Sequence, residues 1–226
     1  MNKRTDQGII LAAGLGTRLN WLTRTRPKAL MPIAGVPVII WVIRRMVAAG
    51  IRHIAINIHH HADLLQSTLG DGEKFGVRLY YSIEQHLLDS GGGAHQAMLC
   101  LPSVSPVLVH NADIVSSIDL HALQQKNAAC VLAVVKNPPH HATGDFTLQQ
   151  GLLGLNHGLR YTFSGVSYWQ PELILSGRLG TRFSLLQSIH AQIHRGKCAG
   201  FFHPGSWFDI GRPADWIQAS KYASTA

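Results

Sequence analysis

Several features that mark other classes of protein are missing from this chain of 226 residues. No apolar run reaches the roughly 18 residues that a membrane-spanning helix needs, and no signal peptide follows the N-terminal MNKRTDQG. The three cysteines, Cys100, Cys130 and Cys198, are isolated from one another in the sequence and show neither metal-ligand spacing nor a disulfide framework. We therefore expect a cytoplasmic protein with buried free thiols.

Long runs of like charge are also missing, although lysine and arginine exceed aspartate and glutamate by 20 to 12. A net charge of +8 is compatible with nucleic-acid binding, yet aromatic residues do not alternate with cations as they do in proteins that bind single strands. In the first third of the chain the cations surround a glycine-rich turn; they are Arg18, Arg24, Arg26, Lys28, Arg44 and Arg45. This distribution favours a small polyphosphate ligand, and affinity for DNA remains an alternative.

Apolar runs of strand character alternate with segments of helical period, which predicts an α/β fold with a mostly parallel central sheet flanked by helices. We expect strands at 9–13, 53–58, 77–82, 107–110, 129–135, 146–149, 161–169 and 199–203. We expect helices at 37–49, 62–69, 95–101 and 184–195, a short helix capped by Asp119 and a final helix from Pro213. No internal repeat and no hexapeptide β-helix occurs, so residues 1–226 are interpreted as one domain.

The stretch from Gly8 to Met31 reads GIILAAGLGTRLNWLTRTRPKALM and organises the rest of the chain. An apolar strand enters a turn of small residues, where main-chain N–H groups can approach and bind phosphate oxygens. Arg18 and Lys28 would add full positive charges. The Walker pattern is absent, because Thr17 and Arg18 follow Gly16, and the third glycine of a dinucleotide fingerprint is absent as well. Alone, such a turn is more often structural than functional.

Three further groups of residues are candidates for ligand binding. The segment EQHLLDSGGG, residues 84–93, is expected to be a loop, because three glycines are costly in a helix; it either contacts a flat ligand or is a flexible turn. Asp113 and Asp209 are single acids among uncharged neighbours, as a Mg²⁺ site built on one or two carboxylates requires, although each alone could be a turn residue.

Histidines are abundant, with runs at 59–61 and 140–141. Adjacent histidines on a strand point to opposite faces, so His59, His60 and His61 are poorly placed to share one zinc ion. His140 and His141 stand just before Gly144-Asp145, where binding of a sugar or phosphate and a plain loop role are both open.

The run Leu11-Ala12-Ala13-Gly14-x-Gly16-Thr17-Arg18, followed by Pro27-Lys28, resembles the signature of the sugar-1-phosphate nucleotidylyltransferases. Further matches are the segment 84–93, Asn111-x-Asp113, Gly144-Asp145, Ser164-Gly165 and Asp209-x-Gly211. Within that superfamily, NPPHHATGDF with TFSG downstream is similar to the N-acetylmuramate α-1-phosphate uridylyltransferases of peptidoglycan recycling.

The resemblance implies a Rossmann-like nucleotidylyltransferase domain that uses a nucleoside triphosphate, UTP by preference, and a sugar 1-phosphate. It implies that nucleotide and triphosphate lie against Leu11, Ala12, Ala13, Gly14, Gly16, Thr17, Arg18 and Lys28, with the base at Glu84, Gly91 and Gly92. Asn111, Asp145 and Gly165 would hold the sugar phosphate, Asp113 and Asp209 would bind Mg²⁺, and Lys28, Arg18 and Asp113 would be catalytic. A monomer or small homo-oligomer without membrane or nucleic-acid partners is expected.

Two alternatives stay open at this point. One keeps the reaction and changes the substrates, to glucose, mannose or heptose 1-phosphate with UTP, dTTP or GTP. The other is a non-catalytic sugar-nucleotide sensor on the same fold, although a sensor could lose Lys28, Asp113 and Asp209 freely.

Overall fold

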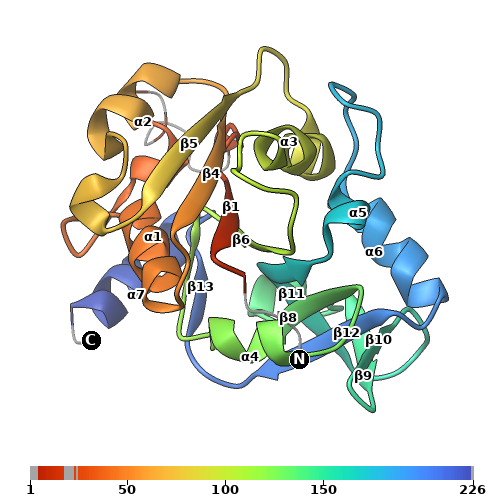
Figure 1. The fold of residues 1–226 in the computed structure, drawn as a ribbon. Helices are drawn as coiled ribbons and strands as arrows, with labels where there is room; N and C mark the ends of the chain where they lie inside the picture. The colour runs from red at the N-terminus through yellow and green to blue at the C-terminus, as the bar shows by residue number, and fades with distance from the viewer. Residues whose placement is uncertain (1–4, 18–22, 24, 225–226) are drawn as a thin grey trace.

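A nine-stranded sheet forms the centre of the molecule in the computed structural model, which describes residues 5–17, 23 and 25–224 (Figure 1). The strands lie in the order β5-β4-β1-β6-β11-β8-β12-β10-β9. In that order they span Arg78–Ile83, His53–Ile58, Gln7–Leu11, Val107–Asn111, Arg160–Trp169, Cys130–Val135, Cys198–His203, Leu152–Gly154 and Phe146–Gln149.

Parallel pairing is concentrated in one half of this sheet. Strands β5, β4, β1 and β6 are all parallel, and β8 is parallel to β12. Strand β11 enters between β6 and β8 in the opposite direction, and β10 and β9 complete an antiparallel edge. The predicted α/β class with a central sheet and flanking helices is confirmed, and the carboxyl ends of β1, β4 and β6 meet at one edge.

Helices cover both faces of the sheet (Figure 1). One face packs against α1 (Val38–Ala48), α2 (Ala62–Leu69) and α4 (Leu120–Gln125), and the other against α3 (Asp89–Met98), α5 (Pro171–Ile174) and α6 (Leu185–His194). Successive residues of β1 go to opposite cores, Ile9 to the α3 side and Ile10 to the α1 side. A strand covered on both faces therefore reads as a continuous apolar run.

Two short hairpins and a last helix complete the fold. Strand β7 (Ile114–Ser116) pairs antiparallel with β13 (Trp207–Asp209), and β2 (Pro32–Ile33) with β3 (Val36–Pro37). Helix α7 (Pro213–Ala223) packs beside them on a third, smaller core. These pairings and α5 are missing from our sequence predictions, because two to four residues carry no measurable period.

Several predicted elements are confirmed residue for residue. The strands at 53–58 and 146–149, the helix at 62–69 and the start of the last helix at Pro213 all have the predicted bounds. Asp119 caps α4, its carboxylate accepting from the backbone N–H groups of His121 and Ala122. No helix among the described residues is long and apolar enough to cross a membrane.

The predicted loop over the three glycines is wrong, because α3 begins at Asp89 and includes all of them. A Cβ at Gly91 would overlap the ring of Phe183, and one at Gly92 would overlap the carbonyl of Thr181. A glycine in a helix interior costs about 1 kcal/mol relative to alanine. Here glycine is required, because α3 packs closely against the segment before α6.

The cysteines are free, as expected, but two of them are neighbours in space. Cys130 and Cys198 are register partners on β8 and β12, and their Sγ atoms lie 3.2 Å apart. The contact with Cys198 and burial raise the pKa of the Cys130 thiol far above its ordinary value, which disfavours its thiolate. Both thiols lie in the core.

Candidate active site

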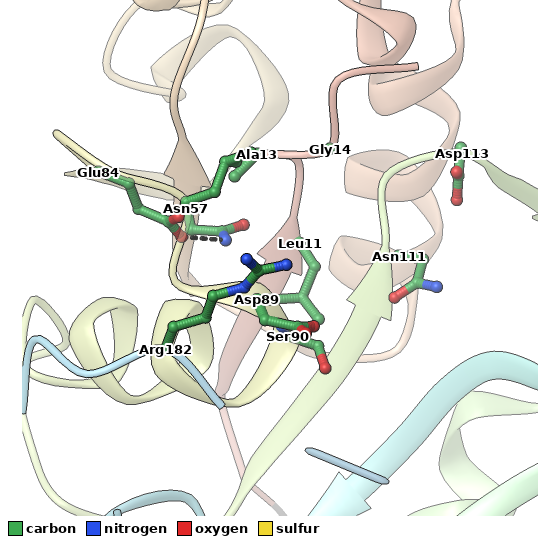
Figure 2. A pocket seen from close by; sticks show the side chains of 11 residues that line it. Leu11, Ala13, Gly14, Asn57, Glu84, Asp89, Ser90, Asn111, Asp113 and Arg182 are labelled. Carbon is green, nitrogen blue, oxygen red and sulfur yellow. Dashed lines mark hydrogen bonds between the residues drawn. The ribbon is translucent and has the colours of Figure 1, made fainter. Parts of the chain in front are cut away.

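A cavity of about 380 Å³, here called the first cavity, lies at the carboxyl ends of β1, β4 and β6 (Figure 2). Such an edge is where ligands bind in open α/β sheets. The lining residues are Leu11, Ala13, Gly14, Asn57, Glu84, Leu87, Asp89, Ser90, Asn111, Asp113 and Arg182.

The turn after β1 forms one wall of the first cavity. Its beginning is fixed, because the N–H of Ala12 donates to Oδ1 of Asn57 at 2.7 Å. The space around Gly14 is open, since a Cβ there would have no neighbour within 4 Å. Gly16 has φ +65° and packs against Thr23 and Lys28, so this position favours glycine. The turn therefore presents main chain rather than side chains to the cavity.

Asn57 and Glu84 form a buried polar pair at one end of the first cavity. Glu84 is 3% exposed; its Oε1 accepts from Nδ2 of Asn57 at 2.7 Å and its Oε2 accepts from the N–H of Leu88 at 2.9 Å. Two hydrogen bonds compensate the burial of the carboxylate. A Cβ at Gly93 would lie 2.5 Å from Oε1 of Glu84. Sequence reasoning missed Asn57, whose signal is a lone amide in the strand HIAINI.

At the other end, Lys28 lies between two acids. Its Nζ is 2.5 Å from Oδ2 of Asp113 and 3.3 Å from Oδ1 of Asp209. The acids are close because β7 and β13 pair, which places Asp209 opposite Ile114, and because the N–H of Ile210 donates to the carbonyl of Asp113. The structure thus unites three residues that the sequence separates widely.

The charge of this group suits a cation and phosphates. Two carboxylates on one ammonium leave an excess negative charge, and each of the three side chains is partly exposed, at 11% to 26%. Within the described ranges no group of three or more His, Cys, Asp or Glu residues could hold a metal. Two protein carboxylates completed by substrate phosphates are the usual donor set for Mg²⁺, so the residues present fit that ion.

A second cavity, of about 290 Å³, adjoins the first. Its lining comprises Leu11, Ser90, Val109, Asn111, Asp145, Phe146, Phe163, Gly165, Ser167, Ser184, Leu185, Leu186 and Ile189. The two cavities share Leu11, Ser90 and Asn111. The second cavity is the more apolar of the two, since α6 and two phenylalanines form much of its wall.

Asn111, Gly165 and Asp145 lie together in the second cavity. The family resemblance had assigned these three residues to one site. Strand β11 bulges between Phe163 and Ser167, and Gly165 has φ +79° there. A Cβ at Gly165 would lie 2.7 Å from Nδ2 of Asn111. The glycine therefore makes room for the asparagine that both cavities share.

Asp145 is held by two hydrogen bonds. Its Oδ1 lies 2.9 Å from Nε2 of His141, and its Oδ2 accepts from the N–H of Phe163 at 2.8 Å. His141, whose role the sequence left open, therefore orients an acid at the cavity. By contrast, Nδ1 of His59 bonds to the carbonyl of Glu84, and neither it nor His60 lines the two cavities.

Some predicted contacts lie elsewhere. Gly91 and Gly92 do not line either cavity, and both donate their N–H groups to the carbonyl of Phe183. Five further predicted residues are absent from both linings: Ala12, Gly16, Thr17, Lys28 and Asp209. Arg18 lies outside the described residues. The structure adds Arg182, which enters the first cavity from the segment before α6 (Figure 2). No sequence pattern pointed to it.

Comparisons with known proteins agree with this fold and site. The chain matches the family described as nucleotidyl transferase over residues 7–144. An N-acetylmuramate alpha-1-phosphate uridylyltransferase of Neisseria meningitidis serogroup B is 35% identical, over 96% of this chain and 98% of the relative. The enzyme of the same name from Caulobacter vibrioides is 31% identical over 100% of both chains.

Two further comparisons are broader. A mannose-1-phosphate guanylyltransferase of Mycobacterium tuberculosis is 34% identical over 51% of this chain and 32% of the relative. The solved structure of HddC from Yersinia pseudotuberculosis has a TM-score of 0.81 at 20% identity, covering 96% of this chain and 99% of the other, which shows the fold alone.

The chain belongs to the nucleotidyl transferase family. Within that family it is a sugar-1-phosphate nucleotidylyltransferase, as the LAAGLGTR and Pro27-Lys28 motifs predicted.

Proposed function

We propose that the protein transfers a uridylyl group from UTP to N-acetylmuramate 1-phosphate and releases pyrophosphate, a step of peptidoglycan recycling in the cytoplasm. The observation that carries this proposal is the match to two uridylyltransferases over nearly the whole of both chains, at 35% and 31% identity. Mannose-1-phosphate guanylyltransferases match either about half of the chain or, at 24% identity, 95% of it.

The paired cavities support two substrates that meet at a shared wall. In this proposal the nucleotide lies in the first cavity, with its base near Glu84 and its phosphates near Lys28. The sugar lies in the second cavity against Asn111 and Asp145. The shared residues Leu11, Ser90 and Asn111 then separate the nucleoside from the sugar, and the reacting phosphates meet beside Asp113.

The proposed reaction is an in-line displacement. A phosphate oxygen of the sugar 1-phosphate forms a bond to the α-phosphorus of UTP, and the bond from that phosphorus to the bridging oxygen of pyrophosphate breaks. Positioning and charge neutralisation supply most of such a rate enhancement. Lys28 neutralises phosphate charge, and the open turn at Gly14 admits the phosphates to the main chain.

Asp113 and Asp209 would hold Mg²⁺, which when bound neutralises phosphate charge further. In the structure the ammonium of Lys28 bridges the same two carboxylates. With Mg²⁺ held by these carboxylates, Lys28 would contact phosphate instead.

The test is pyrophosphate release by the purified protein with Mg²⁺, using UTP, dTTP, CTP, GTP and ATP against N-acetylmuramate, N-acetylglucosamine, glucose and mannose 1-phosphates. We expect the highest turnover with UTP and N-acetylmuramate 1-phosphate. Highest turnover with GTP and mannose 1-phosphate would replace the proposal by the second candidate that the partial match favours. Binding without turnover across the grid would indicate a sensor.

A further inference from the structure

Arg182 is a cation in the first cavity that the proposed mechanism does not use. Its guanidinium points into the cavity beside Leu11 and Ser90, far from Asp113 at the opposite end (Figure 2). Within the part of the chain that the structure describes, its side chain has no ion pair or hydrogen bond. A guanidinium offers five donors in a planar fork, a geometry suited to a carboxylate.

The backbone at Arg182 is firmly placed. The carbonyl of the next residue, Phe183, accepts from the N–H groups of Gly91 at 2.9 Å and Gly92 at 3.1 Å, and the N–H of Phe183 donates to the carbonyl of Leu88 at 3.1 Å. The Phe183 ring occupies the space that a side chain at position 91 would need. The consecutive glycines of α3 therefore hold the segment that carries Arg182.

Arg182 lines the first cavity, and the chain then passes directly to the second. Ser184, two residues further on, lines the second cavity, and its Oγ lies 3.3 Å from Oγ of Ser90, which lines both. The phosphates are assigned to the end with Lys28 and Asp113. Arg182 is therefore available to a different anionic group, one that reaches the first cavity from the second across the shared wall.

The second cavity supplies no positive charge of its own from lysine or arginine among its lining residues. Its charged side chain is Asp145, which repels a carboxylate. N-acetylmuramate carries a carboxylate on its lactyl substituent, whereas N-acetylglucosamine is uncharged apart from its phosphate. Both cavities have acids in their linings, and Arg182 is the one lysine or arginine among the lining residues of the two. Because an unpaired carboxylate is costly to desolvate, a lactyl carboxylate enclosed here would pair with Arg182.

We propose that Arg182 binds the lactyl carboxylate of the sugar substrate and so selects N-acetylmuramate 1-phosphate over N-acetylglucosamine 1-phosphate. The inference rests on the proposed function and assigns its sugar specificity to one side chain. Two parallel N–H···O bonds from the guanidinium would fix the orientation of the lactyl group.

The experiment measures kcat/KM for both sugar 1-phosphates at saturating UTP, in the wild-type protein and in Arg182→Gln. We expect the preference for the muramate to fall roughly 10- to 100-fold in the variant, the typical effect of a hydrogen bond to a charged group. The KM for UTP should stay unchanged. The matched control is Arg178→Gln, since Arg178 is an exposed arginine of the same segment that lines neither cavity.

A second arm removes the charge from the substrate instead. The methyl ester of the lactyl carboxylate should lose activity with the wild type and lose no more with Arg182→Gln, as a double-mutant cycle requires of two interacting groups. A preserved sugar preference in Arg182→Gln, or a rise in the KM for UTP without a change of preference, would overturn the inference. Failure of the proposed function is distinct, because it appears as a wild-type protein that does not favour the muramate.

Discussion

The two cavities are built in different ways, although they share a wall. The first stands on the carboxyl ends of parallel strands, and its polar groups hold one another: Asn57 bonds to the N–H of Ala12 and to Glu84. The second stands on a bulged antiparallel strand and an apolar helix face, with Asp145 as its acid. In the proposed function, the hydrogen-bonded first cavity binds the nucleotide. The second cavity, lined by side chains, binds the sugar, which is the substrate that differs among related enzymes.

The strongest test changes Lys28, the cation that bridges Asp113 and Asp209 beyond one end of the first cavity. Lys28→Ala removes the cation beside both reacting phosphates, so we expect turnover to fall roughly 10²- to 10³-fold, about 2.7–4 kcal/mol in transition-state stabilisation. The loss should appear in kcat, measured with both substrates saturating.

The fold of that variant is the necessary control. Asp113 and Asp209 would face each other without the ammonium, so Mg²⁺ should raise the Tm of Lys28→Ala more than that of the wild type. Lys221→Ala on α7, which changes an exposed lysine, should behave as the wild type in both measurements. Near-normal turnover in Lys28→Ala would contradict the role given to this lysine.

Two glycines differ in their relation to the first cavity: Gly93 packs behind its polar pair, and Gly14 lines it. Gly93→Ala places a Cβ against Asn57 and Glu84, and we expect a loss of roughly 1–3 kcal/mol in the free energy of unfolding. Gly14→Ala meets no atom within 4 Å and should leave stability unchanged while raising the KM for the nucleotide. Urea unfolding and initial rates measure the two effects. Equal stability of both variants would show that the polar pair tolerates displacement.

The three residues that the sequence assigned to the sugar phosphate, Asn111, Asp145 and Gly165, all line the second cavity, whereas the predictions for the first cavity were met only in part. The strand at 53–58 and the helix at 62–69 have strong periodic patterns, and Asn111 and Asp113 follow a buried strand directly. Three features depend on residues distant in the sequence. They are the pairing of β13, which carries Asp209, with β7, the contact of Phe183 with the glycines of α3, and the approach of Arg182 to the first cavity. The local pattern of hydrophobic residues carries no information on such contacts, because they are set by tertiary packing.

A buried histidine, His110, lies next to Asn111 of the shared wall and makes the stability of this region depend on pH. His110 precedes Asn111, bonds to that residue's carbonyl through Nδ1 and is fully buried. Burial, with the nearby charge of Arg45, lowers the pKa of His110 from 6.5 to about 4. The folded state resists protonation, so its stability is complete above pH 6.5 and falls as the pH drops toward 4.

At pH 5 this difference amounts to about 2 kcal/mol, since one pKa unit corresponds to about 1.4 kcal/mol. In His110→Leu the decrease in unfolding free energy between pH 7.5 and pH 5 should therefore shrink by that amount. Urea unfolding at both pH values measures it, with the exposed His157→Leu as the matched control. Unchanged pH dependence in His110→Leu would assign the acid sensitivity to other buried histidines, such as His95 and His203.

The smallest expected effect lies in the second cavity, at the residue that orients its acid. His141→Ala removes the partner of Oδ1 of Asp145, while the bond from the N–H of Phe163 to Oδ2 remains. Because one of two restraints is kept, we expect a severalfold rise in the KM for the sugar 1-phosphate, an unchanged KM for UTP and little change in kcat. His141→Asn, which retains a side-chain donor, should recover part of the loss. If the KM for UTP rose instead, Asp145 would have to serve the nucleotide, and the division between the two cavities would fail.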